Sequence, residues 1–392
     1  MKEKLYDSID NMKTEINDIA DYIFDNPETG LKEYKASKLV MDYLEKENFK
    51  VNRGIAGMDT AFQATYEKGT GGVSIGLLCE YDALAVVGHA CAHHIQAPIM
   101  LAVAKALKDN LKDINYKIVV YGTPAEETYG GKIKMIYEGY FNDIDVALMV
   151  HGWDTTVVDN SNLAYSCFEV KFCGKKAHAS ASPETGISAL DALLLTFNGV
   201  EFMREHVKDD VRIHYTVIDA GGPSNVVPEK AVGEFTIRSE SRPYLDTLIP
   251  RFNEVVRGAS IMTGTKYEIT LKKAMNNKVP SHILNELIMK NAIELGAPRP
   301  RDPIVVKGSS DFANVMYEHP GVCLRIAFVD EGIPPHSQGF YDGGKTENAH
   351  LIEVQAAKIL ASVSYDLITS PEKVKEIKNE HQANKVRFFN QV

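Results

Sequence analysis

The sequence predicts an α/β fold in which a mixed, largely parallel sheet is flanked by helices and a smaller α+β domain is inserted. Short apolar runs alternate with helix-like segments, which is typical of buried parallel strands joined by crossover helices. Further along, strand-like segments alternate polar and apolar residues, which is typical of strands with one exposed face. We therefore expect a main domain of residues 1–163 and 280–392, interrupted by a second domain of residues 164–279.

The elements of the main domain follow from local patterns. A stripe of apolar residues predicts one amphipathic helix from Leu5 to Ile23, with Pro27 beyond its end. The later elements are expected as helices at about Tyr34–Glu47, His94–Leu111, Lys132–Gly139 and Glu347–Leu367, and as strands at Val73–Cys79, Lys117–Tyr121, Val146–Val150 and Val322–Phe328. Polar residues follow several of these strands directly. Because ligands bind at the carboxyl edge of an open α/β sheet, we expect the functional site there.

The inserted domain is expected to have a different architecture. Its predicted elements are strands at Ser166–Phe172, Ile213–Ile218, Glu234–Ile237 and Tyr267–Leu271, and helices at about Ser188–Met203 and Leu245–Arg257. The resulting order, β-α-β-β-α-β, suits a small sheet with two helices on one face, as in ferredoxin-like domains.

Composition limits the classes of function. The 392 residues are 44% apolar and 24% charged, as in ordinary globular proteins, and 43 basic against 53 acidic side chains give a net charge of −10. This acidic balance disfavours nucleic acid as a partner. No segment approaches the ~20 apolar residues of a transmembrane helix, so no membrane association is expected. The charged N-terminus and five scattered cysteines favour the reducing cytoplasm over export.

The strongest local signal is the run from Gly88 to His94, which contains Cys91 and His93. A thiolate and an imidazole two residues apart, in a loop between a strand and a helix, can bind one divalent cation. Taken alone, this pattern also fits residues packed in a core.

Two further strand ends carry groups of the same chemistry. Glu126 and Glu127 follow one buried strand, where one carboxylate can bind a metal while the other acts as a general base. His151 follows the next strand, so three successive strand ends offer S, N and O donors. By themselves, His178 and His336 would be read as ordinary surface and loop histidines.

Together these motifs resemble the metallopeptidase-20 superfamily of aminoacylases, carboxypeptidases and dipeptidases. The resemblance is strongest to its amidohydrolase branch, which includes the aminobenzoyl-glutamate hydrolase subunits, and it covers nearly the whole chain. It rests on Asn26–Gly30, Glu80–Leu84, His89–His93, Pro124–Glu127, Val150–His151, Gly174–Ala179, Asn225–Pro228, Gly308–Phe312 and His336. It implies a zinc-exopeptidase-like catalytic domain, with the inserted domain as a lid and dimerisation domain.

The resemblance also implies a site with two divalent metal ions per chain, Zn²⁺ or Mn²⁺, with Co²⁺ or Ni²⁺ as alternatives. Cys91 would bridge the two ions. The terminal ligands would be His93, Glu127, His151 and His336. Glu126 would be the general base that takes a proton from water and passes it to the leaving amine.

Other residues receive supporting roles from the same resemblance. His178 would reach the site of a partner subunit to stabilise the tetrahedral intermediate, which implies a homodimer or a higher homo-oligomer. Asn225 would bind substrate, and Arg238 would pair with its carboxylate. Asp82 and His94 would support the metal ligands. The sequence departs from the family pattern at His94, where Asp or Asn is common, and at Ala92, where Gly is common.

The leading hypothesis is a metal-dependent amidase or dipeptidase that cleaves the amide bond of an N-acyl or N-aminoacyl amino acid. One alternative is a catalytically silent homologue that acts as a binding or partner subunit, which the departures at Ala92 and His94 favour. A structural zinc protein is a third reading, which the adjacent Glu126 disfavours because a structural site is closed by four ligands. The sequence does not choose among aminobenzoyl-glutamate, β-alanyl dipeptides, ordinary dipeptides and N-acyl amino acids as substrate.

Overall fold

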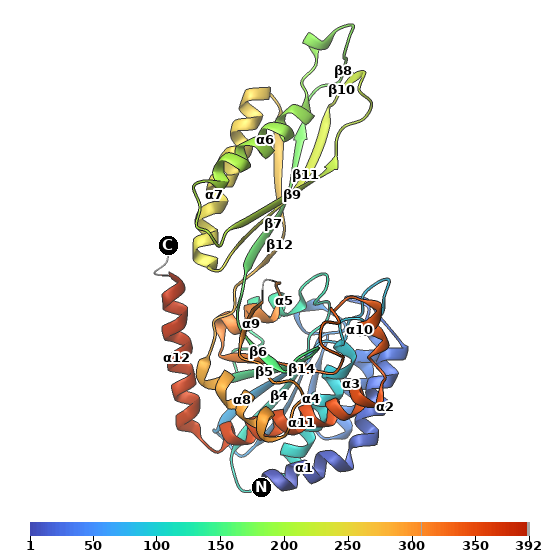
Figure 1. Ribbon diagram of the computed structural model, residues 1–392, viewed down its shortest axis with the longest axis vertical. Helices are drawn as coiled ribbons and strands as arrows, with labels where there is room; N and C mark the ends of the chain where they lie inside the picture. The colour runs from blue at the N-terminus through green and yellow to red at the C-terminus, as the bar shows by residue number, and fades with distance from the viewer. Residues whose placement is uncertain (307, 390–392) are drawn as a thin grey trace. The chain divides into compact units, whose positions relative to one another are not determined.

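The computed structural model describes residues 1–306 and 308–389, which divide into two compact units (Figure 1). Unit 1 contains Met1–Ser161, Lys278–Val306 and Ser310–Lys385. Unit 2 contains Asn162–Asn277 with residues 308–309 and 386–389. Unit 1 is therefore built from segments that are far apart in the sequence, and unit 2 is mainly one continuous stretch between them.

Unit 1 is built around one mixed sheet. Its strands are β1 (Lys50–Arg53), β2 (Phe62–Lys68), β3 (Val73–Cys79), β4 (Tyr116–Gly122), β5 (Val146–Trp153), β6 (Val157–Asn162), β13 (Ile304–Val306) and β14 (Gly321–Ala327). They lie in the order β1-β2-β4-β3-β5-β14-β6-β13. The central strands β4, β3, β5 and β14 are parallel, whereas β1, β2 and β6 pair antiparallel with their neighbours. The predicted fold class, a mixed sheet flanked by helices, is confirmed.

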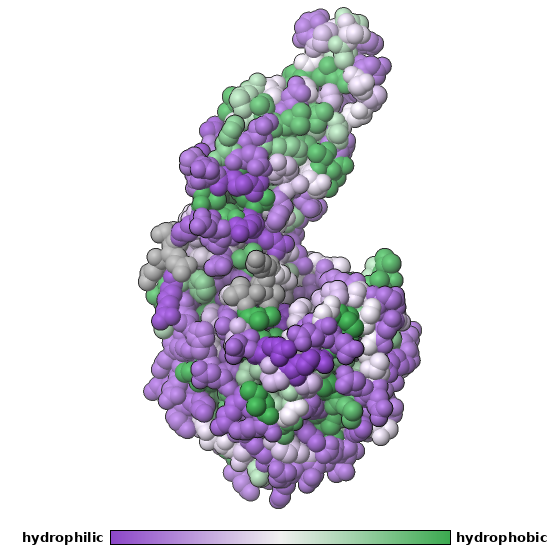
Figure 2. All heavy atoms as spheres, viewed as in Figure 1, coloured by the Kyte–Doolittle hydropathy of each residue, from purple (hydrophilic) through white to green (hydrophobic). Residues whose placement is uncertain are grey.

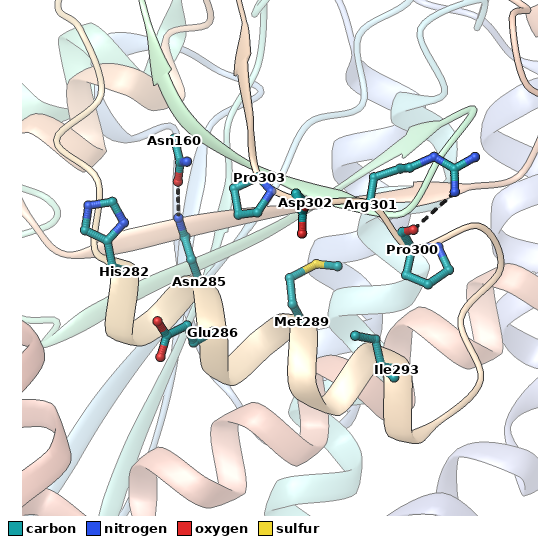
Figure 3. A pocket seen from close by; sticks show the side chains of 10 residues that line it. All are labelled: Asn160, His282, Asn285, Glu286, Met289, Ile293, Pro300, Arg301, Asp302 and Pro303. Atoms are coloured by element: carbon teal, nitrogen blue, oxygen red, sulfur yellow. Dashed lines mark hydrogen bonds between the residues drawn. The ribbon is translucent and has the colours of Figure 1, made fainter.

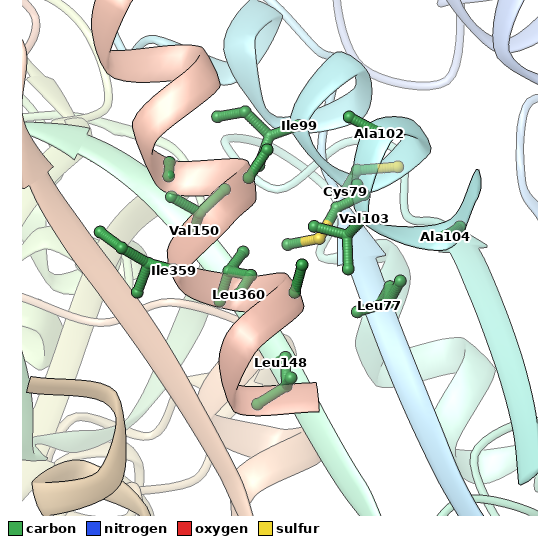
Figure 4. Packing of buried hydrophobic residues seen from close by; sticks show 14 of the residues in the cluster. Leu77, Cys79, Ile99, Ala102, Val103, Ala104, Leu148, Val150, Ile359 and Leu360 are labelled. Atoms are coloured by element: carbon green, nitrogen blue, oxygen red, sulfur yellow. The ribbon is translucent and has the colours of Figure 1, made fainter. Parts of the chain in front are cut away.

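Helices cover both faces of this sheet, and alternate residues of each strand point to opposite faces. One face packs on α1 (Lys2–Asn11), α2 (Lys13–Asp25), α3 (Tyr34–Lys46), α4 (Gln96–Asn110), α8 (His282–Glu294) and α11 (Glu347–Ile368). Figure 4 shows Leu77 and Val150 of the strands packed against Ile99 of α4 and Ile359 of α11. The opposite face packs on α5 (Gly131–Tyr137) and α9 (Phe312–Glu318). Although α4 and α11 bury many apolar residues, no helix in the described residues is long and apolar enough to cross a membrane.

Some local predictions for unit 1 were wrong. The helix expected from Leu5 to Ile23 is two helices, because the backbone at Met12 leaves the regular helical path while both halves keep their buried stripe. His151 was expected beyond its strand but lies within β5, which extends to Trp153. The sequence analysis also missed β1, β2, β6, α8, α9, α10 (Gln338–Asp342) and α12 (Pro371–Phe389). β6 was missed because its sequence, VVDNSN, is largely polar although most of it is buried.

Unit 2 has its own core. Its main elements are β7 (Ala164–Cys173), α6 (Ala189–Arg204), β9 (Arg212–Asp219), β11 (Lys230–Ser239), α7 (Arg242–Thr263) and β12 (Lys266–Met275). This is the predicted β-α-β-β-α-β order, and the antiparallel sheet runs β12-β7-β11-β9. A buried cluster that includes Phe168, Phe235 and Phe252 joins the sheet to α6 and α7. A separate two-stranded sheet pairs β8 (Ala177–His178) with β10 (Val226–Val227).

Candidate active site

The predicted metal ligands gather at one edge of the unit 1 sheet. Because β3, β4 and β5 are parallel, their carboxyl ends meet at this edge. The chain after β3 carries Cys91, the chain after β4 carries Glu127, and β5 carries His151 near its end. His336 comes from the chain after β14, and its backbone N–H donates to the carbonyl of Ala90 at 2.8 Å.

The candidate ligands form two overlapping groups. Donor atoms of Cys91, His93 and His151 lie within 4.8 Å of one another, and so do those of Cys91, Glu127 and His336. Cys91 is common to both groups, and its Sγ lies 3.6 Å from Nε2 of His151. All five residues that the family resemblance implies as ligands are thus brought together, and His93 and Glu127 also form a group with Glu126.

The chemistry of these donors fits divalent metal ions. Thiolate, imidazole and carboxylate together suit borderline cations such as Zn²⁺. Nε2 of His93 and Oε1 of Glu127 are buried and make no hydrogen bond within the described residues, although Oε1 lies 3.1 Å from Nε2 of His336. Burial raises the pKa of Cys91 to about 12, so its thiolate requires a nearby positive charge.

Hydrogen bonds orient the candidate ligands from behind. Nδ1 of His93 donates to the backbone and carboxylate oxygens of Asp82, both at 3.0 Å, whereas Nε2 makes no hydrogen bond to the described residues and lies 3.3 Å from Oε2 of Glu80. The other carboxylate oxygen of Asp82 accepts from the backbone N–H of Glu127 at 3.1 Å. Nδ1 of His151 donates to the carbonyl of Gly152 at 2.7 Å. The position of Asp82 therefore suits the supporting role expected from the resemblance.

Three residues of this site have left-handed backbone conformations that favour glycine. Ala92, Ala125 and His336 have φ of 58°, 61° and 64°. Such a conformation costs a non-glycine residue roughly 1–2 kcal/mol. Ala92 replaces the glycine common in the family, yet it keeps the backbone conformation that glycine would adopt. The loop between Cys91 and His93 is therefore preserved at a cost in strain.

Glu126 lies beside a buried charge network that the sequence analysis missed. Nζ of Lys132 contacts Oε1 of Glu80 at 2.6 Å and Oδ1 of Asp311 at 2.7 Å, and these three side chains are at most 1% exposed. Carboxylate oxygens of Glu80, Glu126 and Asp311 lie within 4.8 Å of one another. Burial, together with the charges of Glu80 and Asp311, raises the pKa of Glu126 to about 8. A carboxyl group that titrates near neutrality can both accept and return a proton.

The signal for this network was present but incomplete. Glu80 and Asp311 fall inside motifs that carry the family resemblance, but no role was assigned to either. Lys132 lies in the first turn of α5, where a lysine ordinarily faces solvent. Only the tertiary structure brings the three charges together.

Glu33 is another buried carboxyl group that the sequence did not reveal. Its Oε1 accepts the backbone N–H groups of Leu31 at 3.0 Å and Ala125 at 2.9 Å, and its Oε2 accepts the hydroxyl of Thr60 at 2.8 Å. Glu33 thus holds the strained residue that precedes Glu126. Burial raises the pKa of Glu33 to about 7.

His94, the other departure from the family pattern, contacts a different part of unit 1. Its Nε2 donates to the carbonyl of Gly344 at 2.9 Å, and its ring packs edge-on against Phe24. Within the described residues, it makes no hydrogen bond to a candidate ligand. Its contact instead links the Cys91–His93 loop to the segment that follows His336 and α10.

The three remaining candidates belong to unit 2. His178 of β8 is exposed, and its Nδ1 accepts the N–H groups of Ser180 at 3.3 Å and Ala181 at 3.2 Å, so the neutral ring carries its proton on Nε2. Asn225 lies next to it, since its carbonyl accepts the N–H of Ala179 at 3.0 Å. Arg238 of β11 lies over the ring of Tyr165 at 4.9 Å and donates to Oγ of Ser309 at 3.1 Å.

A separate pocket in unit 1 contains none of the predicted site residues. Its volume is about 450 Å³, and it lies between α8 and residues 300–303 (Figure 3). Asn160, Asn285 and Arg301 are among its lining residues, and Nδ2 of Asn285 donates to Oδ1 of Asn160 at 3.2 Å. This pocket offers neither a thiol nor clustered metal-type ligands, so it is not the candidate active site.

Comparison with known families identifies the family of this chain. The profile of peptidase family M20/M25/M40 matches residues 83–356, which is more than half of the chain. The chain belongs to this family. This M20 chain is accordingly a hydrolase that acts on amide or peptide bonds.

The similarity to individual relatives extends over nearly the whole M20 chain. The Xaa-Arg dipeptidase of Mus musculus is 28% identical over 396 residues, which cover 97% of this chain and 92% of that protein. One of the subunits of p-aminobenzoyl-glutamate hydrolase from Escherichia coli (strain K12) is 28% identical over 453 residues, covering 96% of this chain and 94% of the relative.

Solved structures share the fold. An aminobenzoyl-glutamate utilization protein from Klebsiella pneumoniae matches with a TM-score of 0.74 at 21% identity, covering 92% of this chain and 98% of the other. A dinuclear metal binding peptidase of the M20 family from Bacillus subtilis matches with a TM-score of 0.70 at 17% identity, covering 92% and 99%.

The buried carboxyl group of Glu33 predicts a specific pH dependence of stability. Its pKa is about 7 in the folded chain against 4.5 normally, so between these values the unfolded chain has lost the proton that the folded chain still binds. The free energy of unfolding therefore falls as the pH rises through this window. Glu33→Gln removes this term, so from pH 5 to pH 8 the wild type should lose about 2–3 kcal/mol more than the variant.

Urea denaturation at the two pH values measures this difference. Glu67→Gln is the control, because Glu67 is exposed on β2 and the substitution should leave the pH dependence of the wild type unchanged. If Glu33→Gln and the wild type lose stability in parallel, Glu33 does not bind its proton more tightly in the folded chain.

Proposed function

We propose that this M20 chain is a two-metal amidohydrolase that cleaves the amide bond of N-acyl or N-aminoacyl amino acids. The observation that carries this proposal is the position of the Cys91 thiol, which is common to two groups of metal-type ligands next to the half-buried carboxyl of Glu126. The relatives are named for a dipeptidase and for a hydrolase of p-aminobenzoyl-glutamate, and both names describe an amide bond to an amino acid. A metal-loaded wild type that hydrolyses no member of a broad panel of dipeptides and N-acyl amino acids would contradict it.

We assign one metal ion to Cys91, His93 and His151, and the other to Cys91, Glu127 and His336. The donor set suits Zn²⁺ or Mn²⁺, with Co²⁺ and Ni²⁺ as alternatives. When bound, two such ions supply the positive charge that polarises a carbonyl group and lowers the pKa of water toward ~7.

Glu126 is the proposed general base. It would take a proton from the attacking water at its carboxylate and then deliver that proton to the nitrogen of the leaving amine. Its pKa of about 8, raised first by burial, supports a group that can hold the proton between the two transfers. Beside it, the charge of Lys132 lowers the pKa of Glu80 against the effect of burial and would keep Glu80 ionised, and Lys132 also ion-pairs with Asp311.

Glu126→Gln should lower kcat by a factor of about 10²–10⁴, because glutamine keeps the shape of the side chain but cannot accept a proton at neutral pH. The metal content should remain that of the wild type, since Glu126 is not an assigned ligand. Steady-state kinetics and elemental analysis of the same preparation measure both quantities. Glu138→Gln, at an exposed position after α5, is the matched control and should retain full activity. Retained turnover in Glu126→Gln would remove Glu126 from this role.

The shared thiol predicts an order of metal loss. His151→Ala and His336→Ala each remove a ligand from one group, so each should hold about one ion per chain where the wild type holds about two. Cys91→Ala removes a ligand from both groups and should hold fewer ions than either. His206→Ala, exposed in unit 2, is the control.

Inductively coupled plasma mass spectrometry after dialysis gives these ratios. Equal loss in Cys91→Ala and His336→Ala would contradict a bridging thiol. A wild type that holds no metal under loading conditions would instead support the catalytically silent alternative.

We further propose that unit 2 is a lid and a dimerisation domain. Figure 2 shows apolar patches on the surface of this unit. Phe202 of α6 is 75% exposed and Ile218 of the edge strand β9 is 58% exposed, and such side chains are typical of protein interfaces. In the dimer, Nε2–H of His178 would donate to the oxyanion that forms in the partner subunit's site, while Asn225 would bind substrate. Its exposure and its protonated Nε2 suit His178 to this role.

Complementation tests the dimer and the role of His178 together. Glu126→Gln and His178→Ala homodimers should each be nearly inactive. A mixed dimer would contain one site that combines an intact Glu126 with an intact His178 from the other chain. Random mixing by co-expression should therefore restore about a quarter of wild-type activity, because about half of the dimers are mixed and each has one working site. No recovery above the homodimers, or a monomeric wild type in light scattering, would contradict the proposal.

A further inference from the structure

Arg325 of β14 shares a sheet face with the candidate metal ligands. In the parallel pairing of β5 with β14, Arg325 lies directly opposite His151. Val150 and Leu324, one residue earlier on each strand, point into the main core. Because successive residues alternate between faces, His151 and Arg325 both point to the other side of the sheet. Arg325 is therefore the neighbour of a metal-type ligand in the adjacent strand.

Asp159 and Lys278 fix the charge around this arginine. Nε of Arg325 donates to Oδ1 of Asp159 at 2.7 Å, and Nζ of Lys278 contacts the other carboxylate oxygen. The side chains of Asp159, Lys278 and Arg325 are 2%, 3% and 11% exposed. Asp159 thus contacts two buried cations, and Arg325 uses only its Nε for this ion pair. A substrate anion could therefore pair with the rest of this guanidinium group without displacing Asp159.

Trp153 fixes the plane of the guanidinium group. The guanidinium carbon of Arg325 lies 4.3 Å from the centre of the Trp153 ring, and Trp153 follows His151 by two residues on the same face. Because Asp159 holds Nε and one face of the guanidinium group packs on the indole ring, the orientation of the two terminal nitrogens is fixed before any ligand binds.

The two terminal nitrogens of Arg325 make no hydrogen bond to the described residues. Within those residues, the side chain hydrogen-bonds only to Asp159, through Nε. Neither nitrogen belongs to the buried side-chain atoms of the described residues that lack a partner, so both are accessible to solvent and to a ligand. Paired terminal nitrogens of a guanidinium match the two oxygens of a carboxylate.

We propose that Arg325 binds the free carboxylate of the amino-acid part of the substrate through its two terminal nitrogens. This rests on the proposed function, and it narrows the substrates to N-acyl or N-aminoacyl amino acids whose α-carboxylate is free. It also moves carboxylate recognition from Arg238 of unit 2, the residue expected from the sequence, to unit 1. The arginine and His151 stand side by side, so the bound carboxylate lies on the sheet face that carries the metal ligands.

Paired substrates test this assignment. For the metal-loaded wild type, an N-acyl amino acid or dipeptide should have a kcat/KM about 10- to 100-fold above that of its C-terminal amide. Arg325→Met should lose most of this preference, mainly through a higher KM for the acid. Its kcat/KM for the amide should change by less than about 3-fold. Arg325→Lys, which keeps the charge and favours folding, should restore part of the preference.

Two further variants separate the alternatives. Arg301→Met is the matched control, because Arg301 pairs with Glu331 at the exposed surface and the preference should be unchanged. Arg238→Met tests the competing residue. If Arg238→Met but not Arg325→Met selectively lowers kcat/KM for the acid, the proposal is overturned. It is also overturned if Arg325→Met and Arg325→Lys lower kcat/KM equally for the acid and the amide.

Binding of the product amino acid gives a reading that does not need turnover. The free amino acid, but not its amide, should raise the melting temperature of the metal-loaded wild type, and Arg325→Met should abolish this rise while Arg325→Lys keeps part of it. Equal shifts with the acid and the amide, or no shift with either, would overturn the assignment of Arg325. A wild type that shows the acid-specific shift but hydrolyses no substrate would instead contradict the proposed function and leave the carboxylate site supported.

Discussion

Four neighbouring parallel strands, β4, β3, β5 and β14, must all end at one edge of the sheet, and the candidate site depends on this constraint. Each strand is buried on both faces, so its register is strongly determined. A shift of β5 by one residue would turn His151 into the main core and expose Val150 to the site. The order and direction of the strands therefore bring the chain segments that follow them close together, whatever the sequences of those segments.

This convergence concentrates charge and strain in a buried place. Lys132 stabilises Glu80 and Asp311, which would otherwise be two unpaired buried carboxylates beside Glu126. Ala125 and His336 are held in unfavourable backbone conformations by a carboxyl oxygen of Glu33 and a carbonyl of Ala90. The apolar cores on both faces of the sheet stabilise the frame that keeps these groups in place. The buried charges and the strained backbone of the site thus lower stability locally, and the packing of the rest of unit 1 offsets this loss.

Acidic and basic side chains also lie in different places around the candidate site. The acidic side, with Glu80, Glu126 and Asp311, surrounds one lysine. On the neighbouring strands β14 and β6, Arg325 pairs with Asp159, which also contacts Lys278. Such an arrangement suits a substrate with a polar bond at one end and a carboxylate beside it, since each end meets a complementary environment. The five candidate metal ligands belong to unit 1, whereas His178, Asn225 and Arg238 belong to unit 2.

Local sequence patterns were sufficient to predict the fold class, the order of strands and helices in unit 2, and the cluster of Cys91, Glu127 and His151 at successive strand ends. These features are written in local periodicity and in short motifs at strand ends, which a single sequence displays directly. The division of the first helix at Met12, the polar strand β6, and the pairings of Lys132, Glu33 and Arg325 emerged only from the folded chain. Their partners lie many residues away, and whether a charged side chain is buried depends on which distant segments cover it.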